Sequence, residues 1–305
     1  MPFGCVYGYS NGYINDNNKN NKYISKIVNN SFFIQNEINS QQILYPDYQD
    51  FFVLFDTYEL LSIGEIDKTI VVTNNSNNDS YIVRYKDINW IPFPTYLTSS
   101  LSPRIYIRRL FGVHRNLLKN LYILHKKGIV HNNIRRNNIL LFLDNDEPFL
   151  TNFKLSITNN SISKYFFRYS PQYTFWTFEC HLCAYIIEKN VRVLSYMNLG
   201  TVIENYNLHA LIKLEDNDAK EFEKYIGWNS DKIIEEIAKW RFTWDNFALT
   251  IMMIEIVNEN ISSGLDLTWY KEILYKCTHA NPNKRLSIKQ TNKLLVDSSF
   301  PKLQK

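Results

Sequence analysis

The chain has 305 residues, of which 45% are hydrophobic and 15% aromatic, enough to build one two-lobed unit or two small domains. Charged residues make up 21%, the formal net charge is +4, and Lys and Arg are scattered along the sequence, so the composition predicts no nucleic-acid binding. No apolar run reaches the roughly 18 residues of a membrane span, and the first residues lack the pattern of a signal peptide. We therefore expect a cytoplasmic protein without a membrane segment.

The first third of the chain is predicted to be rich in β-structure. Short runs of β-branched and aromatic residues alternate with turn signals. These predicted strands are residues 5–9, 23–28, 51–55, 69–73 and 81–85. A weakly helical pattern covers residues 32–44, among the strands. Residues 90–94, Trp-Ile-Pro-Phe-Pro, break the pattern and predict a hinge.

The remainder is predicted to be mostly helical. A long amphipathic pattern covers residues 104–127 and ends at Gly128. Two short strands, at 139–143 and 149–150, follow it. Further helices are predicted at residues 178–188, 233–239, 243–257, 267–278 and 288–295. The sequence thus predicts the α+β class, with a small β-rich part at 1–89 and a larger α-helical part at 90–305.

The cysteines offer one candidate metal motif. Cys180 and Cys183 form a Cys-x-x-Cys with His181 between them, but no second pair stands nearby. A closed zinc site needs four ligands at suitable spacing. We therefore favour buried, reduced thiols on a helix over a zinc site, and predict no metal-binding residues.

Residues 131–141 are the most informative stretch. His131 is followed by Asn133 two residues later and by Asn138 five residues after that, and then by an apolar strand. This spacing resembles the catalytic loop of the protein kinase superfamily, His-Arg-Asp, four residues, Asn, most like its serine/threonine branch. The approach to the loop, residues 124–131, also resembles that family. The family's catalytic Asp is replaced by Asn133.

Three further motifs follow in the order found in kinases. Residues 152–154, Asn-Phe-Lys, stand where the family has Asp-Phe-Gly. Glu179 stands at the end of the activation segment, and Arg285 in the Pro-x-x-Arg near the C-terminus. The resemblance implies a buried ion pair between Glu179 and Arg285. It also implies that Asp245 braces the backbone of the catalytic loop.

The family resemblance implies a two-lobed fold with an N-lobe at 1–89, a C-lobe at 90–305 and the catalytic-loop region at 131–154. In the N-lobe, Gly4 and Val6 resemble the end of a Gly-rich loop, and Lys26 resembles the phosphate-contacting Lys. Glu37 resembles the helix residue that pairs with this Lys. The alternatives are that Lys26 is a strand-edge charge and Glu37 lies on a solvated helix face.

The substitutions fall on the residues that handle charge in phosphoryl transfer. Asn133 can orient a hydroxyl but is no base near pH 7. Asn152, with Asn138, would give magnesium only neutral ligands, which argues against magnesium and leaves ATP binding open. Arg135 stands at the position of the catalytic-loop Lys. Either Arg135 and Lys154 partly replace the metal, or, as we favour, both are solvated charges.

The resulting prediction is a protein kinase-like protein that has lost catalysis, a pseudokinase, and that acts by binding a protein partner. Residues 165–176 and 190–240 are the candidate surfaces for this partner. The alternative is an active serine/threonine protein kinase that uses ATP with atypical catalytic residues and phosphorylates a protein substrate. The Asn- and Ile-rich composition resembles that of kinase-like proteins of large DNA viruses, which would place the protein in a host cell or virion.

Overall fold

The structure is a computed structural model of mixed α+β class in which helices predominate. It describes residues 23–28, 31–45, 47–48, 51–54, 57–60, 81–86, 90–99, 102–142, 145–158, 169–259 and 267–299. For the strands at 23–28, 57–60 and 81–86 it describes the backbone alone.

An antiparallel sheet and one helix form the first part of the described chain. The sheet has the order β1-β3-β2, with β1 at Tyr23–Val28, β2 at Thr57–Leu60 and β3 at Tyr81–Lys86. The helix α1 spans Ser31–Leu44 and packs on it. Two predicted strands and the predicted helix are thus confirmed, β2 was not predicted, and the predicted strands at 5–9 and 69–73 lie outside the described residues.

A second antiparallel sheet, of order β4-β6-β7, lies next to the long helix α3. Its strands are β4 at Trp90–Pro92, β6 at Ile139–Phe142 and β7 at Pro148–Leu150. The predicted break at 90–94 is instead this strand β4 followed directly by α2, Phe93–Thr98, because a proline fits the first turn of a helix. The run predicted as a strand at 51–55 contributes a single bridge, from Phe52 to Leu150.

The helix α3, Pro103–Lys126, was predicted almost to the residue. The Ser102 hydroxyl accepts the N–H of Ile105 at its start, and Gly128, with φ +76°, follows its end. The short strands β5, Ile129–Val130, and β8, Ile157–Thr158, pair with each other after it. The other helices are α4 Phe178–Glu188, α5 Tyr196–His209, α6 Asp216–Glu223, α7 Ser230–Ala238, α8 Trp244–Glu259, α9 Thr268–Cys277 and α10 Ile288–Ser299. Single 3₁₀ turns occur at η1 Arg136–Asn138, η2 Phe153–Leu155, η3 Arg241–Thr243 and η5 Pro282–Lys284.

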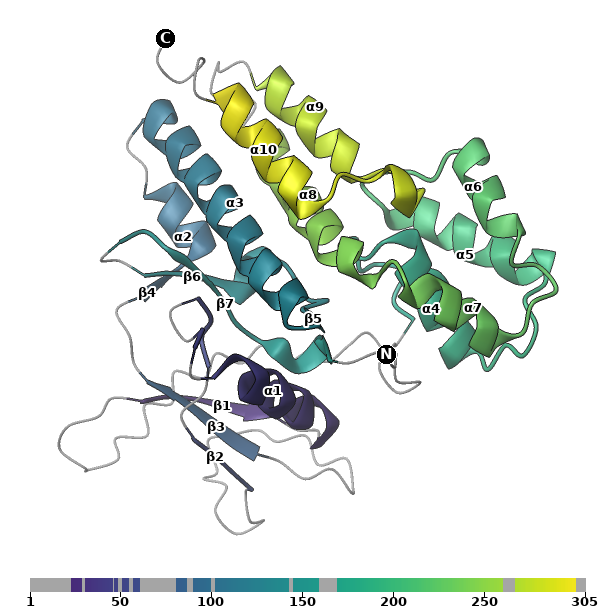
Figure 1. The fold of residues 1–305 in the computed structure, drawn as a ribbon, viewed down its shortest axis with the longest axis horizontal. Coiled ribbons are helices and arrows are strands. Elements are labelled where there is room, and N and C mark those ends of the chain that lie inside the picture. Colours follow the sequence, from purple (N-terminus) through teal and green to yellow (C-terminus); the bar gives the residue numbers. More distant parts are fainter. Residues whose placement is uncertain are drawn as a thin grey trace.

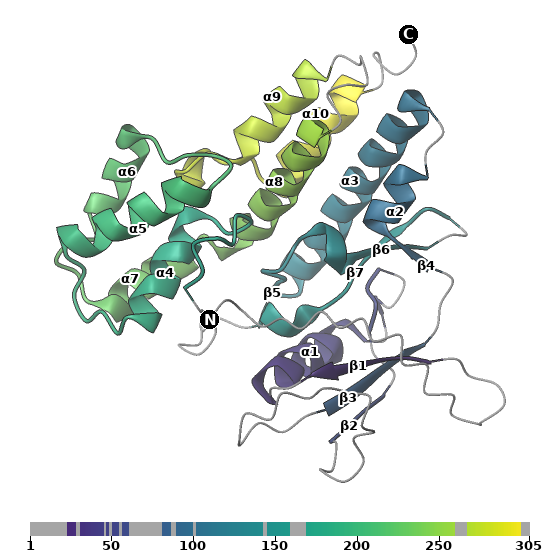
Figure 2. The ribbon, with the colours of Figure 1, turned by 180° about the vertical axis from the view of Figure 1, so that it is seen from behind.

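The helices gather around two apolar clusters that share α8. One cluster joins α3, the far part of α8, α9 and α10 with strands β6 and β7, and the other joins α4 to α7. Almost every residue of α8 is buried, which explains why its sequence is apolar all round rather than amphipathic. Figure 1 shows the two helical groups on either side of α8 and the β1-β3-β2 sheet with α1 at the other end of the molecule, and Figure 2 shows the same order from behind. Across the described ranges, no helix combines the length and the apolar character that a bilayer span requires.

Candidate functional site

The buried carboxylate of Asp245, in the first turn of α8, holds the 131–138 loop from one side. Its two oxygens accept the backbone N–H groups of His131 and Asn132, each at 2.7 Å. The Nε2 atom of His125 lies 3.2 Å from the same carboxylate. Asn132 adopts the left-handed conformation, with φ 56°, which Asn tolerates better than most residues. The predicted bracing of the loop by Asp245 is confirmed.

Three amide side chains meet on the other side of this loop. The Nδ2 atom of Asn138 donates to the backbone oxygen of Asn133 at 2.7 Å. The Nδ2 atom of Asn152 donates to Oδ1 of Asn138 at 3.0 Å, and Nδ2 of Asn133 donates to the backbone oxygen of Asn152 at 3.4 Å. The structure therefore brings together the three residues that the sequence placed at one site, although they lie up to 19 positions apart.

The hydrogen bonds fix which way the amides face. A backbone oxygen can only accept, so Asn138 must turn its nitrogen to Asn133 and its oxygen to Asn152. Asn152 must then present its nitrogen. The backbone of Asn152 is left-handed, with φ 71° and ψ 60°, and its position just before η2 aims the side chain at this network. A carboxylate at position 152 would face the oxygen of Asn138 without a proton to share.

Tyr173 closes the network from the segment that precedes α4. Its hydroxyl donates to Oδ1 of Asn133 at 2.9 Å. The neighbouring Trp176 donates its Nε1 proton to the backbone oxygen of Asn132 at 3.2 Å, so the segment is tied to the loop at two places. The sequence pointed to residues 165–176 only as an aromatic surface and did not single out Tyr173. The phenol therefore occupies the hydrogen-bonding position next to Oδ1 of Asn133.

His131 connects the loop to an aromatic group beneath it. Its ring packs edge-on against Phe153 at 4.7 Å between centroids, and Phe153 packs in the same way against Phe52 at 5.8 Å. Burial lowers the pKa of His131, opposed by the charges of Asp245 and Glu37 and by the carbonyl of Thr151. His131 is thus a neutral, structural member of the site.

Helix α1 is anchored to the segment that contains Asn152. The Nδ2 atom of Asn36 donates to the backbone oxygen of Lys154 at 3.0 Å, and the hydroxyls of Ser40 and Ser156 lie 2.6 Å apart. Glu37, between them, is only 4% exposed. The alternative that Glu37 lies on a solvated helix face is therefore wrong, because α1 turns this residue towards the 131–153 region.

A buried ion pair joins the first turn of α4 to the segment before α10. Arg285 and Glu179 form two hydrogen bonds, Nη1 to Oε1 at 2.6 Å and Nη2 to Oε2 at 2.9 Å. Arg285 also donates to the backbone oxygens of His279 and Ala280. Such a two-point, charge-assisted pair is strong when it is fully hydrogen-bonded. The predicted pair between Glu179 and Arg285 is confirmed.

The structure describes the remaining predicted residues in part or not at all. Gly4 and Val6 lie outside the described residues. Lys26 is described only by its backbone, which pairs with Val83 in the middle of β1. Arg135 and Lys154 are each partly exposed, and the interpretation of both as solvated charges stays a prediction.

Asp146, the described carboxylate of the loop after β6, does not complete the site. Asp146 lies at the far end of the β6–β7 hairpin from Asn138, and it accepts a hydrogen bond from the Tyr96 phenol. Together with burial, this raises the pKa of Tyr96 to about 12. The three amides and the phenol can therefore orient a hydroxyl group but cannot take its proton near pH 7.

The cysteines of the Cys-x-x-Cys motif are buried in α4. Burial raises the pKa of both thiols, Cys180 and Cys183, so they are held as neutral SH groups. Within the described ranges, no group of three or more His, Cys, Asp or Glu residues is arranged to hold a metal ion. The prediction of buried thiols on a helix is confirmed.

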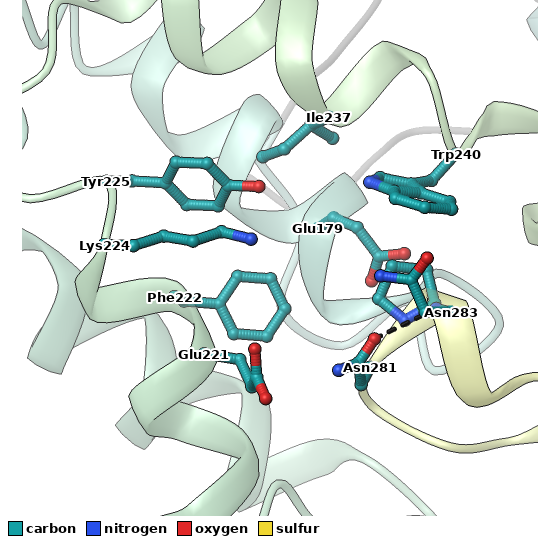
Figure 3. A pocket seen from close by; sticks show the side chains of 10 residues that line it. Glu179, Glu221, Phe222, Lys224, Tyr225, Ile237, Trp240, Asn281 and Asn283 are labelled. Carbon is teal, nitrogen blue, oxygen red and sulfur yellow. Dashed lines mark hydrogen bonds between the residues drawn. The ribbon is translucent and has the colours of Figure 1, made fainter.

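A pocket next to the buried pair has no counterpart in the sequence prediction. It is lined by aromatic and polar side chains of α6, α7 and the 281–283 turn, and by Glu179. Figure 3 shows Lys224 and Tyr225 pointing into it from one side, opposite Trp240. It holds space for little more than a water molecule, so it offers no room for a nucleotide.

Known proteins do not place the chain in a family. Neither a family model nor a curated protein matches it.

Proposed function

We propose that this chain is a protein kinase-like protein of two lobes that has lost efficient phosphoryl transfer and acts by binding a protein partner. Three features support the kinase-like part: Asp245 on the loop backbone, the Glu179–Arg285 pair, and the convergence of Asn133, Asn138 and Asn152. The order of a β-rich part followed by a helical part agrees with it.

The observation that carries the loss of catalysis is the closed hydrogen-bond network of amides. Asn133 holds a phenol and a backbone oxygen instead of offering a base, and a general base typically contributes about 10²–10⁴-fold to rate. Asn152 and Asn138 bond to each other, so these two side chains do not present a pair of oxygens to a cation. Magnesium favours carboxylate oxygen, and the donor set does not fit it. No catalytic step is therefore assigned to a metal here.

The binding part of the proposal rests on exposed apolar side chains within residues 190–240. Val193, Tyr196 and Met197 are 55%, 71% and 78% exposed at the start of α5, and Leu208 at its end is 71% exposed. Large apolar side chains gathered on one surface mark interaction sites. The α5 surface, defined by Val193, Tyr196 and Met197 at the start of the helix, lies at the outer edge of the helical part, away from the β1-β3-β2 sheet (Figure 1).

The catalytic part is tested by thermal unfolding with ATP, with and without magnesium, together with a phosphate-transfer assay on general protein substrates. We expect no transfer and no magnesium-dependent shift for the native chain. The double variant Asn133→Asp with Asn152→Asp restores the two carboxylates and should gain a magnesium-dependent shift. The matched control is Asn229→Asp with Asn283→Asp, two exposed sites, which should gain none. Magnesium-dependent transfer by the native chain would overturn the proposal.

The binding part is tested by site-specific cross-linking from position 197 in cells, compared with the variant Tyr196→Ser. A partner that is captured by the native surface and lost in the variant supports the proposal. Tyr275→Ser, at a site 49% exposed on another helix, is the control and should leave capture unchanged. Equal capture by all three proteins would refute a role for the α5 surface.

A further inference from the structure

Helix α3 has a one-sided charge composition. It runs for 24 residues without an Asp or a Glu. Its Lys and Arg residues are Arg104, Arg108, Arg109, Arg115, Lys119 and Lys126. This arrangement differs from an ordinary solvated helix, where acidic and basic residues alternate and pair. The helix therefore carries a local positive charge larger than the chain's net charge of +4 would suggest.

Most of these cations lie along one line. With about 100° of rotation per residue, five of them fall within an arc of about 60° on the outer side of α3. They are Arg104, Arg108, Arg115, Lys119 and Lys126, here called the basic stripe. The apolar residues of α3, including Leu110, Leu117 and Leu121, occupy the opposite side and are buried in the core. At about 1.5 Å per residue the basic stripe is about 33 Å long.

Helix α10 adds one cation, Lys289, to this surface near the C-terminal end of α3. Lys126 and Lys289 of α10 flank the ring of Tyr122, with their Nζ atoms 5.0 and 5.3 Å from its centroid. The hydrogen bond from Lys126, with the charge of Lys289 nearby, holds the pKa of the Tyr122 phenol below its ordinary value. A positive surface that continues from one helix to the next, with an aromatic ring between the cations, is thus present on the protein.

Four cations of the basic stripe, Arg108, Arg115, Lys119 and Lys126, and the neighbouring Lys289 have no ion-pair partner among the described residues. Elsewhere Arg136, Lys239 and Arg285 each have a carboxylate partner. Arg108, Arg115, Lys119 and Lys126 are therefore available to an external polyanion.

We propose that the basic stripe binds the sugar–phosphate backbone of a nucleic acid. Protein interfaces have an apolar core and are depleted in Lys, whereas this surface is lined by cations with Tyr122 as its aromatic member. A helix that lies on a membrane inserts its apolar face, but the apolar face of α3 is buried in the core. A regular row of Arg and Lys matches the regular phosphates of a nucleic acid and releases their counterions.

The mode of binding follows from the residues. The basic stripe consists of Arg and Lys in a regular row on an outward helix surface, so we expect its contacts to go to the evenly spaced phosphates. Binding should be independent of sequence, with a Kd of roughly 10⁻⁴–10⁻⁶ M, and should weaken steeply with salt. This differs from the expectation drawn from composition, because cations that are scattered along the sequence come together on one side of a helix.

The test is fluorescence anisotropy with a labelled strand of about 20 nucleotides and the matching duplex, from about 50 to about 200 mM salt, the range over which phosphate contacts lose most affinity. The stripe variant is Arg108→Gln, Lys119→Gln and Lys126→Gln. Gln keeps helix propensity, and thermal unfolding checks the fold. We expect the stripe variant to bind about 100-fold more weakly at about 100 mM salt, and the slope of log K against log salt to fall in magnitude by two to three.

The control variant is Lys189→Gln, Lys220→Gln and Lys239→Gln. It removes the same number of positive charges, three, from exposed sites outside the stripe. The control should bind within about twofold of the native chain, because exposed charges beyond a Debye length of about 10 Å are screened. Equal losses in both variants, or no binding at the lowest salt, would overturn the proposal. Tighter binding to a poly-glutamate peptide or to anionic vesicles than to nucleic acid would also overturn it.

Discussion

The two sides of the 131–138 loop are built from different chemistry. On the side of α8, fully charged groups are buried and completely hydrogen-bonded, as in Asp245 with two backbone N–H groups and Arg285 with Glu179. On the side of Asn152, the same loop is hydrogen-bonded to neutral amides and a phenol. The comparison teaches that the charged groups that stabilise the fold are present. The positions where the proposed kinase-like ancestry would require carboxylates, 133 and 152, hold neutral amides.

The largest effect should come from breaking the buried ion pair. Replacing Arg285 with Met leaves the Glu179 carboxylate buried without its partner, which costs about 3–5 kcal/mol of unfolding free energy. Urea unfolding monitored by circular dichroism measures it. Arg136→Met, which breaks the more exposed pair with Glu259, is the matched control and should cost under about 1 kcal/mol. Similar losses in the two variants would contradict a structural role for the buried pair.

A smaller loss is expected from Asp245→Asn. The amide can accept one of the two backbone N–H groups, but its nitrogen faces the other, so about 2–3 kcal/mol of unfolding free energy is lost. The exposed substitution Asp297→Asn should change stability by less than about 0.5 kcal/mol. If Asp245→Asn were equally neutral, the loop would have to be held by other contacts.

The amides do not titrate, so the pH dependence of stability should come from buried histidines on the supporting side. His181 in α4 lies among the rings of Trp176 and Tyr206, and burial lowers its pKa to about 4. Because this folded pKa lies below the unfolded value of about 6.5, the unfolded chain binds a proton that the folded chain does not. The stabilisation is complete above pH 6.5 and falls by about 1.4 kcal/mol per pH unit towards pH 4.

The variant His181→Phe keeps an aromatic ring and removes this titration. Between pH 7 and pH 5 its free energy of unfolding should fall less steeply than that of the native chain. The difference in slope corresponds to the one proton that His181 takes up on unfolding. His114, whose pKa burial lowers to about 3, remains in both proteins and contributes equally. Identical slopes would show that His181 does not titrate in the unfolding reaction.

The smallest effect should come from the neutral side. Tyr173→Phe removes the hydrogen bond to Asn133 and should cost about 1 kcal/mol of unfolding free energy, since one neutral bond contributes about that much. Tyr275→Phe, at a site 49% exposed, should cost nothing measurable. A loss from Tyr173→Phe as large as that from Asp245→Asn would remove the contrast between the two sides of the loop.

The sequence predicted those parts of the fold that have a strong local pattern. Helix α3 has a cap, an apolar face and a terminal glycine, and it was placed within a residue or two. Helix α5 was missed, because its exposed Tyr196, Met197 and Leu208 hide the helical periodicity. The break in regular structure expected at 90–94 was wrong, because these residues form a short strand and prolines that start a helix.

The site was predicted where the motif spacing fixed it. Asn133, Asn138 and Asn152 converge as their positions implied. No local pattern indicated that Tyr173 would bond to Asn133, since a contact between segments 40 residues apart depends on tertiary packing. The basic stripe, by contrast, could have been found from the sequence. A helical projection of residues 104–126 would have shown it, whereas a search for consecutive Lys and Arg did not.

Asp245 binds the loop only through main-chain N–H groups, which every amino acid except proline possesses. These two hydrogen bonds consequently do not depend on the side chain at position 133. Residue 133 can be exchanged, and its chemistry with it, without loss of the bonds that fix the backbone, whereas the left-handed backbone at position 132 favours Asn.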